Sequence, residues 1–148
     1  MHTLAQMFRA RALVSAHPAE STLDVARRMC EQGVGAIVVL DGERLVGIFS
    51  ERDLMKRVVV AGRDPARTPV SAVMTRDVVT AGVRDRVADC EEKMKRAGCR
   101  HLPVLAEGRV LGMISMRDLL RDELEEERQE LRELRAYLHQ APLEPLEG

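Results

Sequence analysis

The stretch GIFSERDL, residues 47–54, is an apolar run that ends in Ser-Glu-Arg-Asp, and it recurs as GMISMRDL at residues 112–119. The two copies lie 65 residues apart, and the same offset aligns Gly33 with Gly98 without a gap. A register that is kept over about forty residues indicates an internal duplication. The chain therefore contains two copies of one structural unit.

Each copy has the hydrophobic pattern of a β-α-β-β-α unit. In the first copy, Ser21 and Asp24 have the spacing of a capping box at a helix start, and Gly33 is the expected left-handed stop. The run AIVVL, the turn DGE and the run RLVGIF predict a β-hairpin, and Ser50 begins a second helix that ends near Ala61. The apolar positions predicted for the two first helices are Leu23, Ala26, Met29 and Cys30 in one copy and Val87, Cys90 and Met94 in the other.

The predicted hairpin strands are apolar at nearly every position. This suits strands that are covered on one face by helices and on the other by the sheet of the second copy. We therefore expect an α/β (α+β) fold of tandem β-α-β-β-α repeats, packed sheet to sheet with pseudo-two-fold symmetry, plus an extended C-terminal helix. The predicted organisation is an N-terminal segment 1–12, a first repeat 13–61, a linker 62–77, a second repeat 78–120, a charged helix 121–140 and a tail 141–148.

The charged helix carries a narrow apolar stripe with heptad spacing. Leu124, Leu131 and Leu138 are seven residues apart, Leu120 and Leu134 occupy the intervening positions, and Glu127 interrupts the seam. Two alternatives remain open for this helix. It lies along its own domain, or it pairs with the same helix of a second subunit.

Composition removes several classes of function. The net charge of −1 and the scarcity of aromatic residues, with two Phe, one Tyr and no Trp, argue against nucleic-acid binding and predict an aliphatic core. No apolar stretch approaches the about 20 residues that span a bilayer, so no membrane association is expected. Cys30, Cys90 and Cys99 are odd in number and lack CxxC spacing, which predicts buried free thiols in a reducing, cytoplasmic setting and no metal site.

The duplicated unit, with GIFSERDL and GMISMRDL at the entrance to each last helix, resembles the cystathionine-β-synthase (CBS) domain pair, or Bateman module, from residue 13 to about residue 120. The stretches GIFSERDLMKRVV and RHLPVLAEGRVLGMISMRDLL, followed by a charged helix that ends in LRAYLH, resemble the stand-alone two-CBS proteins. The resemblance implies a homodimer that binds adenine nucleotides in clefts between the repeats.

In that family the Asp of each motif holds the ribose hydroxyls, the Ser faces the phosphates, and strand residues sandwich the adenine. The resemblance implies a first site from Val14, Ile37, Ser50 and Asp53, and a second from Thr80, Leu102, Pro103, Ser115 and Asp118. Cations that could complete the phosphate sites are Arg52, Lys56 and Arg57 for the first, and Arg100, His101 and Arg117 for the second. Arg117 departs from the small residue common at its position, and it either crowds the second cleft or contacts phosphate.

Elementary electrostatics is consistent with a ligand at each motif. A helix N-terminus attracts a phosphate, and a carboxylate three residues after the Ser can accept two ribose hydroxyls. The same Ser-x-x-Asp spacing is also a capping box, which stabilises a helix start by about 1 kcal/mol without any ligand. The motif alone does not separate the two roles.

The first hypothesis for function is a non-enzymatic regulatory protein that senses energy or redox state through an adenine nucleotide and modulates a partner protein. AMP is the favoured ligand, with ATP or NAD(H) as the others. The alternative is a nucleotide-independent dimerisation or interaction module with vestigial clefts. Catalysis is disfavoured, because no GxxxxGK[ST] loop and no Ser-His-Asp or Cys-His grouping occurs, so no catalytic residue or catalytic cofactor is assigned.

Overall fold

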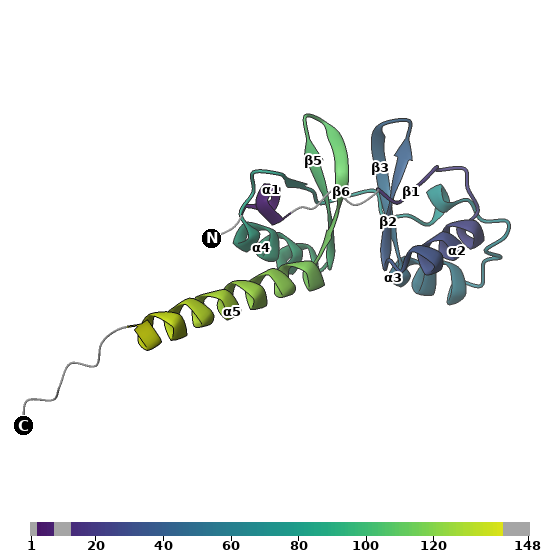
Figure 1. Cartoon of the computed structure of the whole chain (residues 1–148). Helices are drawn as coiled ribbons and strands as arrows, with labels where there is room; N and C mark the ends of the chain where they lie inside the picture. Colours follow the sequence, from purple (N-terminus) through teal and green to yellow (C-terminus); the bar gives the residue numbers. More distant parts are fainter. Residues whose placement is uncertain (1–2, 8–12, 141–148) are drawn as a thin grey trace, which may run out of the picture.

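The computed structural model describes residues 3–7 and 13–140 (Figure 1). The tail 141–148 and residues 1–2 and 8–12 of the N-terminal segment lie outside the described residues. The fold is the expected mixed α/β arrangement, with two three-stranded sheets and a long C-terminal helix.

Both sheets have the same topology. The first holds β1 (Ser15–Ala16), β2 (Ala36–Asp41) and β3 (Arg44–Ser50), with β1 parallel and β3 antiparallel to the central β2. The second holds β4 (Ala81–Gly82), β5 (His101–Ala106) and β6 (Arg109–Ser115) in the same order. The hairpin register shifts between Val39 and Leu40 and, 65 residues later, between Val104 and Leu105. The duplication therefore extends to the irregularities of the sheet.

The helices follow the sequence pattern with one local difference between the repeats. They are α1 (Leu4–Met7), α2 (Thr22–Gln32), α3 (Glu51–Asp53), the π-helical η1 (Leu54–Val59), the 3-10 helix η2 (Val70–Ala72), α4 (Val87–Ala97) and α5 (Met116–Gln140). In repeat 1, α3 runs directly into η1, where the Val60 amide donates to the Met55 carbonyl at 2.9 Å. The equivalent stretch of repeat 2 is regular α-helix.

The first helix of repeat 1 begins and ends as predicted but is rotated about its axis. The Ser21 hydroxyl accepts from the Asp24 amide, and Gly33 has φ of 65°. The buried positions, however, are Thr22, Val25 and Met29, so the prediction of an apolar face with Cys30 was wrong and Cys30 is exposed. The Thr22 hydroxyl donates to the Pro65 carbonyl at 2.9 Å, which allows a polar residue on the buried face. In α4 the predicted Val87, Cys90 and Met94 are buried.

Each repeat has its own core between its sheet and its helices. Repeat 1 buries Ile37, Val39 and Phe49 of the sheet against Val25 and Met29 of α2. In repeat 2 the buried residues are Ala81, Val87, Cys90, Met94, Leu102, Val104, Ile114 and Leu119, together with Leu4 from α1. Leu4 of α1 thus packs on the second repeat, where its amide donates to the Asp85 carbonyl at 3.0 Å.

The segment 62–77, expected as a linker, is packed into repeat 1. Val70, Val73 and Met74 are at most 4% exposed and belong to the first core. Thr75 continues the sheet by exchanging two backbone hydrogen bonds of 2.8 and 2.9 Å with Ile48 of β3. The path from repeat 1 to repeat 2 is therefore held against the edge of the first sheet.

The two hairpins face each other between the outer helices (Figure 1). At the turns, Arg109 of repeat 2 lies 3.6 Å from the carboxylate of Glu43 of repeat 1. At the other end, the ring of His101 approaches Gly35 so closely that a Cβ added to this glycine would lie 3.5 Å from it. Val38 and Pro103 are buried although neither belongs to a helix-side core, so the second face of each sheet is covered as the apolar strands predicted.

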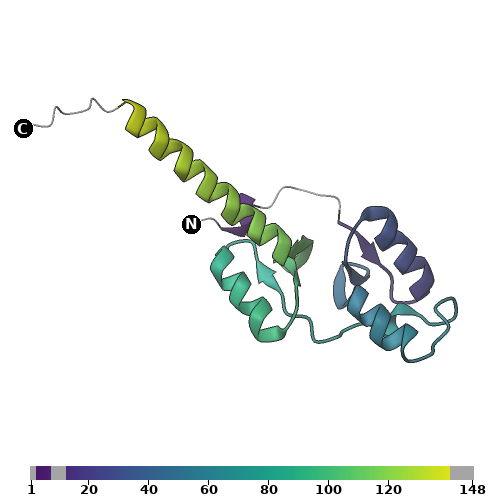
Figure 2. The ribbon, with the colours of Figure 1, turned by 90° about the horizontal axis from the view of Figure 1, so that it is seen from below.

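Helix α5 contacts its own repeat only at its beginning. Leu119 is fully buried in the second core, whereas every residue from 127 to 140 is exposed. Viewed from below, the helix leaves the two repeats and extends away from them (Figure 2). No helix within the described residues is long and apolar enough to cross a membrane.

Candidate functional site

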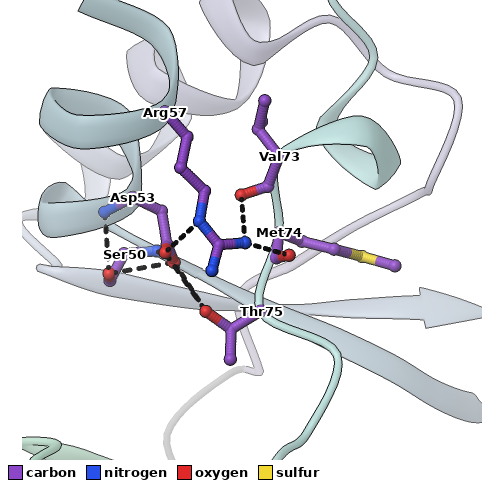
Figure 3. A network of polar contacts seen from close by, with 6 residues as sticks. All are labelled: Ser50, Asp53, Arg57, Val73, Met74 and Thr75. Carbon is purple, nitrogen blue, oxygen red and sulfur yellow. Dashed lines mark hydrogen bonds and ion pairs between the residues drawn. The ribbon is translucent and has the colours of Figure 1, made fainter. Parts of the chain in front are cut away.

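The motif of repeat 1 forms a complete capping box where β3 passes into α3 (Figure 3). The amide and the hydroxyl of Ser50 both donate to Oδ2 of Asp53 at 3.0 Å, and the Asp53 amide donates back to the Ser50 hydroxyl at 3.2 Å. Asp53 is only 8% exposed. This carboxylate therefore stabilises the helix start.

The second oxygen of Asp53 is held by Thr75, which was not expected at a site, and by Arg57, which was expected to contact phosphate. The Thr75 hydroxyl donates to Oδ1 at 3.1 Å, and Nε of Arg57 lies 3.7 Å from the same oxygen. The Arg57 guanidinium also donates to the Met74 carbonyl at 2.8 Å and more weakly to the Val73 carbonyl (Figure 3). Both oxygens of Asp53 are therefore engaged by the chain itself.

The motif of repeat 2 has the same box with fewer partners. The amide and hydroxyl of Ser115 donate to Oδ2 of Asp118 at 2.9 Å, and the Asp118 amide donates to the Ser115 hydroxyl at 3.2 Å. Among the hydrogen bonds of the described residues, those to the Asp118 side chain all end on Oδ2. Asp118 is also half-buried rather than buried. Oδ1 of Asp118 therefore accepts no hydrogen bond within the described residues, whereas Oδ1 of Asp53 accepts one from Thr75.

His101 stands where the second motif meets repeat 1. Burial lowers the pKa of its imidazole, the carboxylates of Glu51 and Asp118 raise it, and Arg100 lowers it again. Gly35, which follows α2 of repeat 1, lies beside both Glu51 and His101. A Cβ added to this glycine would be 3.5 Å from each of these two side chains. Residues from both repeats therefore surround this imidazole, which the net effect keeps neutral near pH 7.

The remaining cations differ in their availability. Arg52, Lys56, Arg100 and Arg117 are exposed, whereas the Arg57 guanidinium is already used by backbone carbonyls. Arg100 and Arg117 flank the second motif in the chain, and the Arg100 carbonyl accepts from the Met116 amide at 2.8 Å. An exposed arginine therefore follows each motif serine by two residues, Arg52 in repeat 1 and Arg117 in repeat 2, and the second motif adds the exposed Arg100.

The strand residues expected to hold an adenine ring are mostly buried. Ile37 and Leu102 are 0% exposed and point into the helix-side cores, so the structure does not bring them to a cleft. Pro103 is buried between the sheets, and Val14 is half-buried beside an open hollow next to Arg28. The half-buried Thr80 accepts from the Lys93 ammonium through its carbonyl at 3.0 Å.

Three residues near the motifs were missed by sequence reasoning. Thr75 sits in the presumed linker, and its only signal is a polar residue directly after the apolar pair Val73-Met74. Gly35 and Glu51 gain their place only through the approach of His101 from the other repeat. Within residues 3–7 and 13–140, no three His, Cys, Asp or Glu side chains gather as a metal site.

Comparison with known proteins decides the family. The profile of the CBS domain matches residues 8–60 and 70–125, one match for each repeat. The chain belongs to the CBS-domain family. The CBS domain-containing protein CBSX3, mitochondrial, of Arabidopsis thaliana is 32% identical over 124 residues, which cover 80% of this chain and 60% of the relative. The chain spans about 60% of the length of the first curated relatives that it matches.

Solved CBS structures share the fold of this CBS pair. The CBS-domain containing protein ATU1752 from Agrobacterium tumefaciens is 30% identical, with a TM-score of 0.77 over 82% of this chain and 99% of that one. The CBS domain protein PAE2072 from Pyrobaculum aerophilum, solved in complex with AMP, is 27% identical, with a TM-score of 0.73 over 79% of this chain and 89% of that one. These structures confirm the fold of this CBS pair, and one of them was solved with AMP bound.

Proposed function

We propose that this CBS pair is a non-enzymatic regulatory protein that binds an adenine nucleotide, AMP before ATP or NAD(H), at the motif of repeat 2. The observation that carries the proposal is the uncommitted Oδ1 of Asp118 at the start of a 25-residue helix. The relative from Pyrobaculum aerophilum that was solved with AMP supports this ligand class.

The chemistry of the second motif suits a nucleotide. Asp118 can accept ribose hydroxyls through Oδ1 while Oδ2 continues to cap the helix. The N-terminus of α5 offers partial positive charge to a phosphate, and the exposed Arg100 and Arg117 can pair with its oxygens. Neutral His101 adds a hydrogen-bonding ring at the junction with repeat 1.

Repeat 1 is expected to bind nucleotide poorly. Asp53 already accepts from Ser50 through Oδ2 and from Thr75 through Oδ1. A ribose would have to replace the Thr75 hydrogen bond in a site that is almost closed to solvent. We therefore assign a structural role to the first motif and a ligand-binding role to the second.

The experiment is titration calorimetry of AMP, ATP, NAD and NADH against the full chain and two matched variants, Asp118→Ala and Asp53→Ala. Asp118→Ala should weaken binding at least about tenfold, because it removes a charge-assisted hydrogen-bond acceptor. Asp53→Ala should retain binding at a temperature where it is folded. The proposal is refuted if none of the four nucleotides binds to the full chain. It is also refuted if wild type and Asp118→Ala bind equally well.

We propose that the protein is a homodimer and that nucleotide binding at the second motif changes how this homodimer acts on a partner protein. Met55 and Val59 of η1 are exposed, and Leu120 and Leu124 expose apolar surface at the equivalent positions of α5. The two helices lie on the same side of the molecule (Figures 1 and 2), so together they offer a second copy one apolar face. Free thiols at all three cysteines suit the cytoplasm, where we place the protein.

A second candidate is an interaction module that does not respond to nucleotides. It is favoured by the capping boxes, because each motif stabilises a helix start without a ligand. This candidate predicts homodimerisation that AMP does not change. Sedimentation of the full chain with and without AMP, read beside the calorimetry, separates the two candidates.

A further inference from the structure

The apolar stripe of α5 is exposed over its whole length. Its five leucines, each between 47% and 64% exposed, are Leu120, Leu124, Leu131, Leu134 and Leu138. In heptad notation Leu124, Leu131 and Leu138 are a positions, and Leu120 and Leu134 are d positions. Exposed apolar side chains in such a row, which only Glu127 interrupts, indicate a surface that is covered by a partner. We call this row the α5 seam.

The seam points away from the protein's own repeat. Beyond its first three residues, the positions of α5 that are not exposed are the buried Leu119 and the half-buried Asp122 and Glu126. These are c and f positions, on the side of the helix opposite to a and d. Beyond the first turn, the side of the helix opposite the seam is therefore the partly buried one, and the seam itself is exposed.

The charges beside the seam are sorted by position. The e positions are Arg121, Arg128 and Arg135, and the charged g positions are Glu123 and Glu130, the next g position being the uncharged Tyr137. All five charged residues are exposed. One flank of the seam is thus basic along three heptads, and the other flank is acidic over two.

This sorting discriminates between the two directions in which α5 could meet a copy of itself. In a parallel pair each g residue faces the e residue of the following heptad of its partner, so Glu123 would meet Arg128 and Glu130 would meet Arg135 of the second copy. In an antiparallel pair e faces e and g faces g, which would bring arginine against arginine and glutamate against glutamate. The charges complement one another only in the parallel pair.

We propose that α5 pairs in parallel and in register with α5 of a second copy of this chain, through the α5 seam. The inference rests on the homodimer proposed above and adds its geometry. Because α5 begins at Met116, directly after the second motif, the two second motifs of the dimer lie at the same end of the paired helices. A nucleotide at either motif then acts on the start of the shared helical pair.

Glu127 occupies the one d position of the seam that is not apolar. In a parallel, in-register pair it faces Glu127 of the second copy, so two carboxylates meet in one layer and weaken the pair. This leaves the dimer reversible, which suits a regulatory protein. It also supplies a test, because an apolar residue at this position should strengthen the pair.

The direction of pairing is tested by disulfide formation in the full chain under a glutathione redox buffer. In a Cys30→Ser background, Leu134→Cys should form a covalent dimer, because paired d residues lie within the Cα separation of roughly 4.4–6.8 Å that a disulfide needs. In an antiparallel pair centred on the seam, the two introduced thiols would lie about 15 Å apart along the axis. Arg132→Cys on the outer face is the matched control and should stay monomeric on a non-reducing gel.

A second measurement uses sedimentation to obtain the dimer dissociation constant. Glu127→Leu should tighten the dimer about tenfold or more, and Glu125→Leu, which adds the same side chain on the outer face, should leave it unchanged. A dimer in which Leu134→Cys cross-links no faster than Arg132→Cys overturns the parallel pairing but not the nucleotide site. A chain that stays monomeric at all concentrations overturns the homodimer itself, whereas nucleotide binding is measured independently by calorimetry.

Discussion

The two Ser-x-x-Asp boxes are an internal comparison, because the same substitution can be made in each repeat. Asp53→Ala removes a carboxylate that accepts hydrogen bonds from Ser50 and Thr75 and forms a 3.7 Å ion pair with Arg57. Asp118→Ala removes one that accepts from Ser115 alone among the described residues. The difference in stability between the two variants therefore reports the contacts that only repeat 1 makes.

The magnitude follows from those contacts. Loss of a capping side chain costs about 1 kcal/mol, and this applies to both variants. Asp53→Ala also loses a hydrogen bond from Thr75 to a charged group, worth about 1.5–3 kcal/mol. The Arg57 pair adds little, because that side chain is 50% exposed. We expect about 3 kcal/mol for Asp53→Ala and about 1 kcal/mol for Asp118→Ala.

The assay is thermal unfolding by circular dichroism at one protein concentration, since dimerisation also stabilises the fold. A difference of about 2 kcal/mol should place the Tm of Asp53→Ala about 4–8 °C below that of Asp118→Ala. Thr75→Val should cost stability in the wild type and little in the Asp53→Ala background. Equal losses for the two aspartate variants, or a full effect of Thr75→Val in both backgrounds, would show that the Thr75 contact does not stabilise repeat 1.

Two further predictions concern titrating groups. Burial holds the pKa of His101 below its ordinary 6.5, so the folded chain keeps this ring neutral while the unfolded chain takes up a proton as the pH falls through 6.5. The Tm of the wild type should therefore fall as the pH is lowered from 7.5 to 5.5, and the Tm of His101→Gln should fall less. An equal fall in Tm for the two proteins would contradict this prediction. Burial also raises the pKa of Cys90 to about 11, so iodoacetamide at pH 8 should label the exposed Cys30 in the native protein and Cys90 only after unfolding. Peptide mapping by mass spectrometry checks the order, and rapid native labelling of Cys90 would contradict it.

Local rules were enough to predict the repeated unit from sequence. The 65-residue offset, the capping boxes and the left-handed glycine stops depend on neighbours within about one helical turn or on direct comparison of the two copies. The apolar hairpins predicted strands covered on both faces, and Val38 is buried outside the helix-side cores as that requires. The second helix of each repeat starts at the predicted serine.

The residues of the candidate sites were harder to predict from the sequence than the secondary structure. The serines and aspartates of both motifs come together as their spacing indicates. Ile37 and Leu102, placed in the sites by resemblance, are instead fully buried in the cores. Which strand residues face a cleft depends on how the sheet packs. When every position of a strand is apolar, the sequence does not show which side chains lie on which face of the sheet.

Sequence alone predicted the duplication, the order of elements in each repeat and the two capped helix starts, because these depend on comparing the two copies or on neighbours within about one helical turn. Tertiary structure alone decided that Thr75 engages Asp53 across 22 residues, and that His101 meets Gly35 of the other repeat. It also decided that the α5 seam faces away from its own module. These features depend on contacts between segments distant in the chain, whose geometry is set by packing of the two cores rather than by any local pattern.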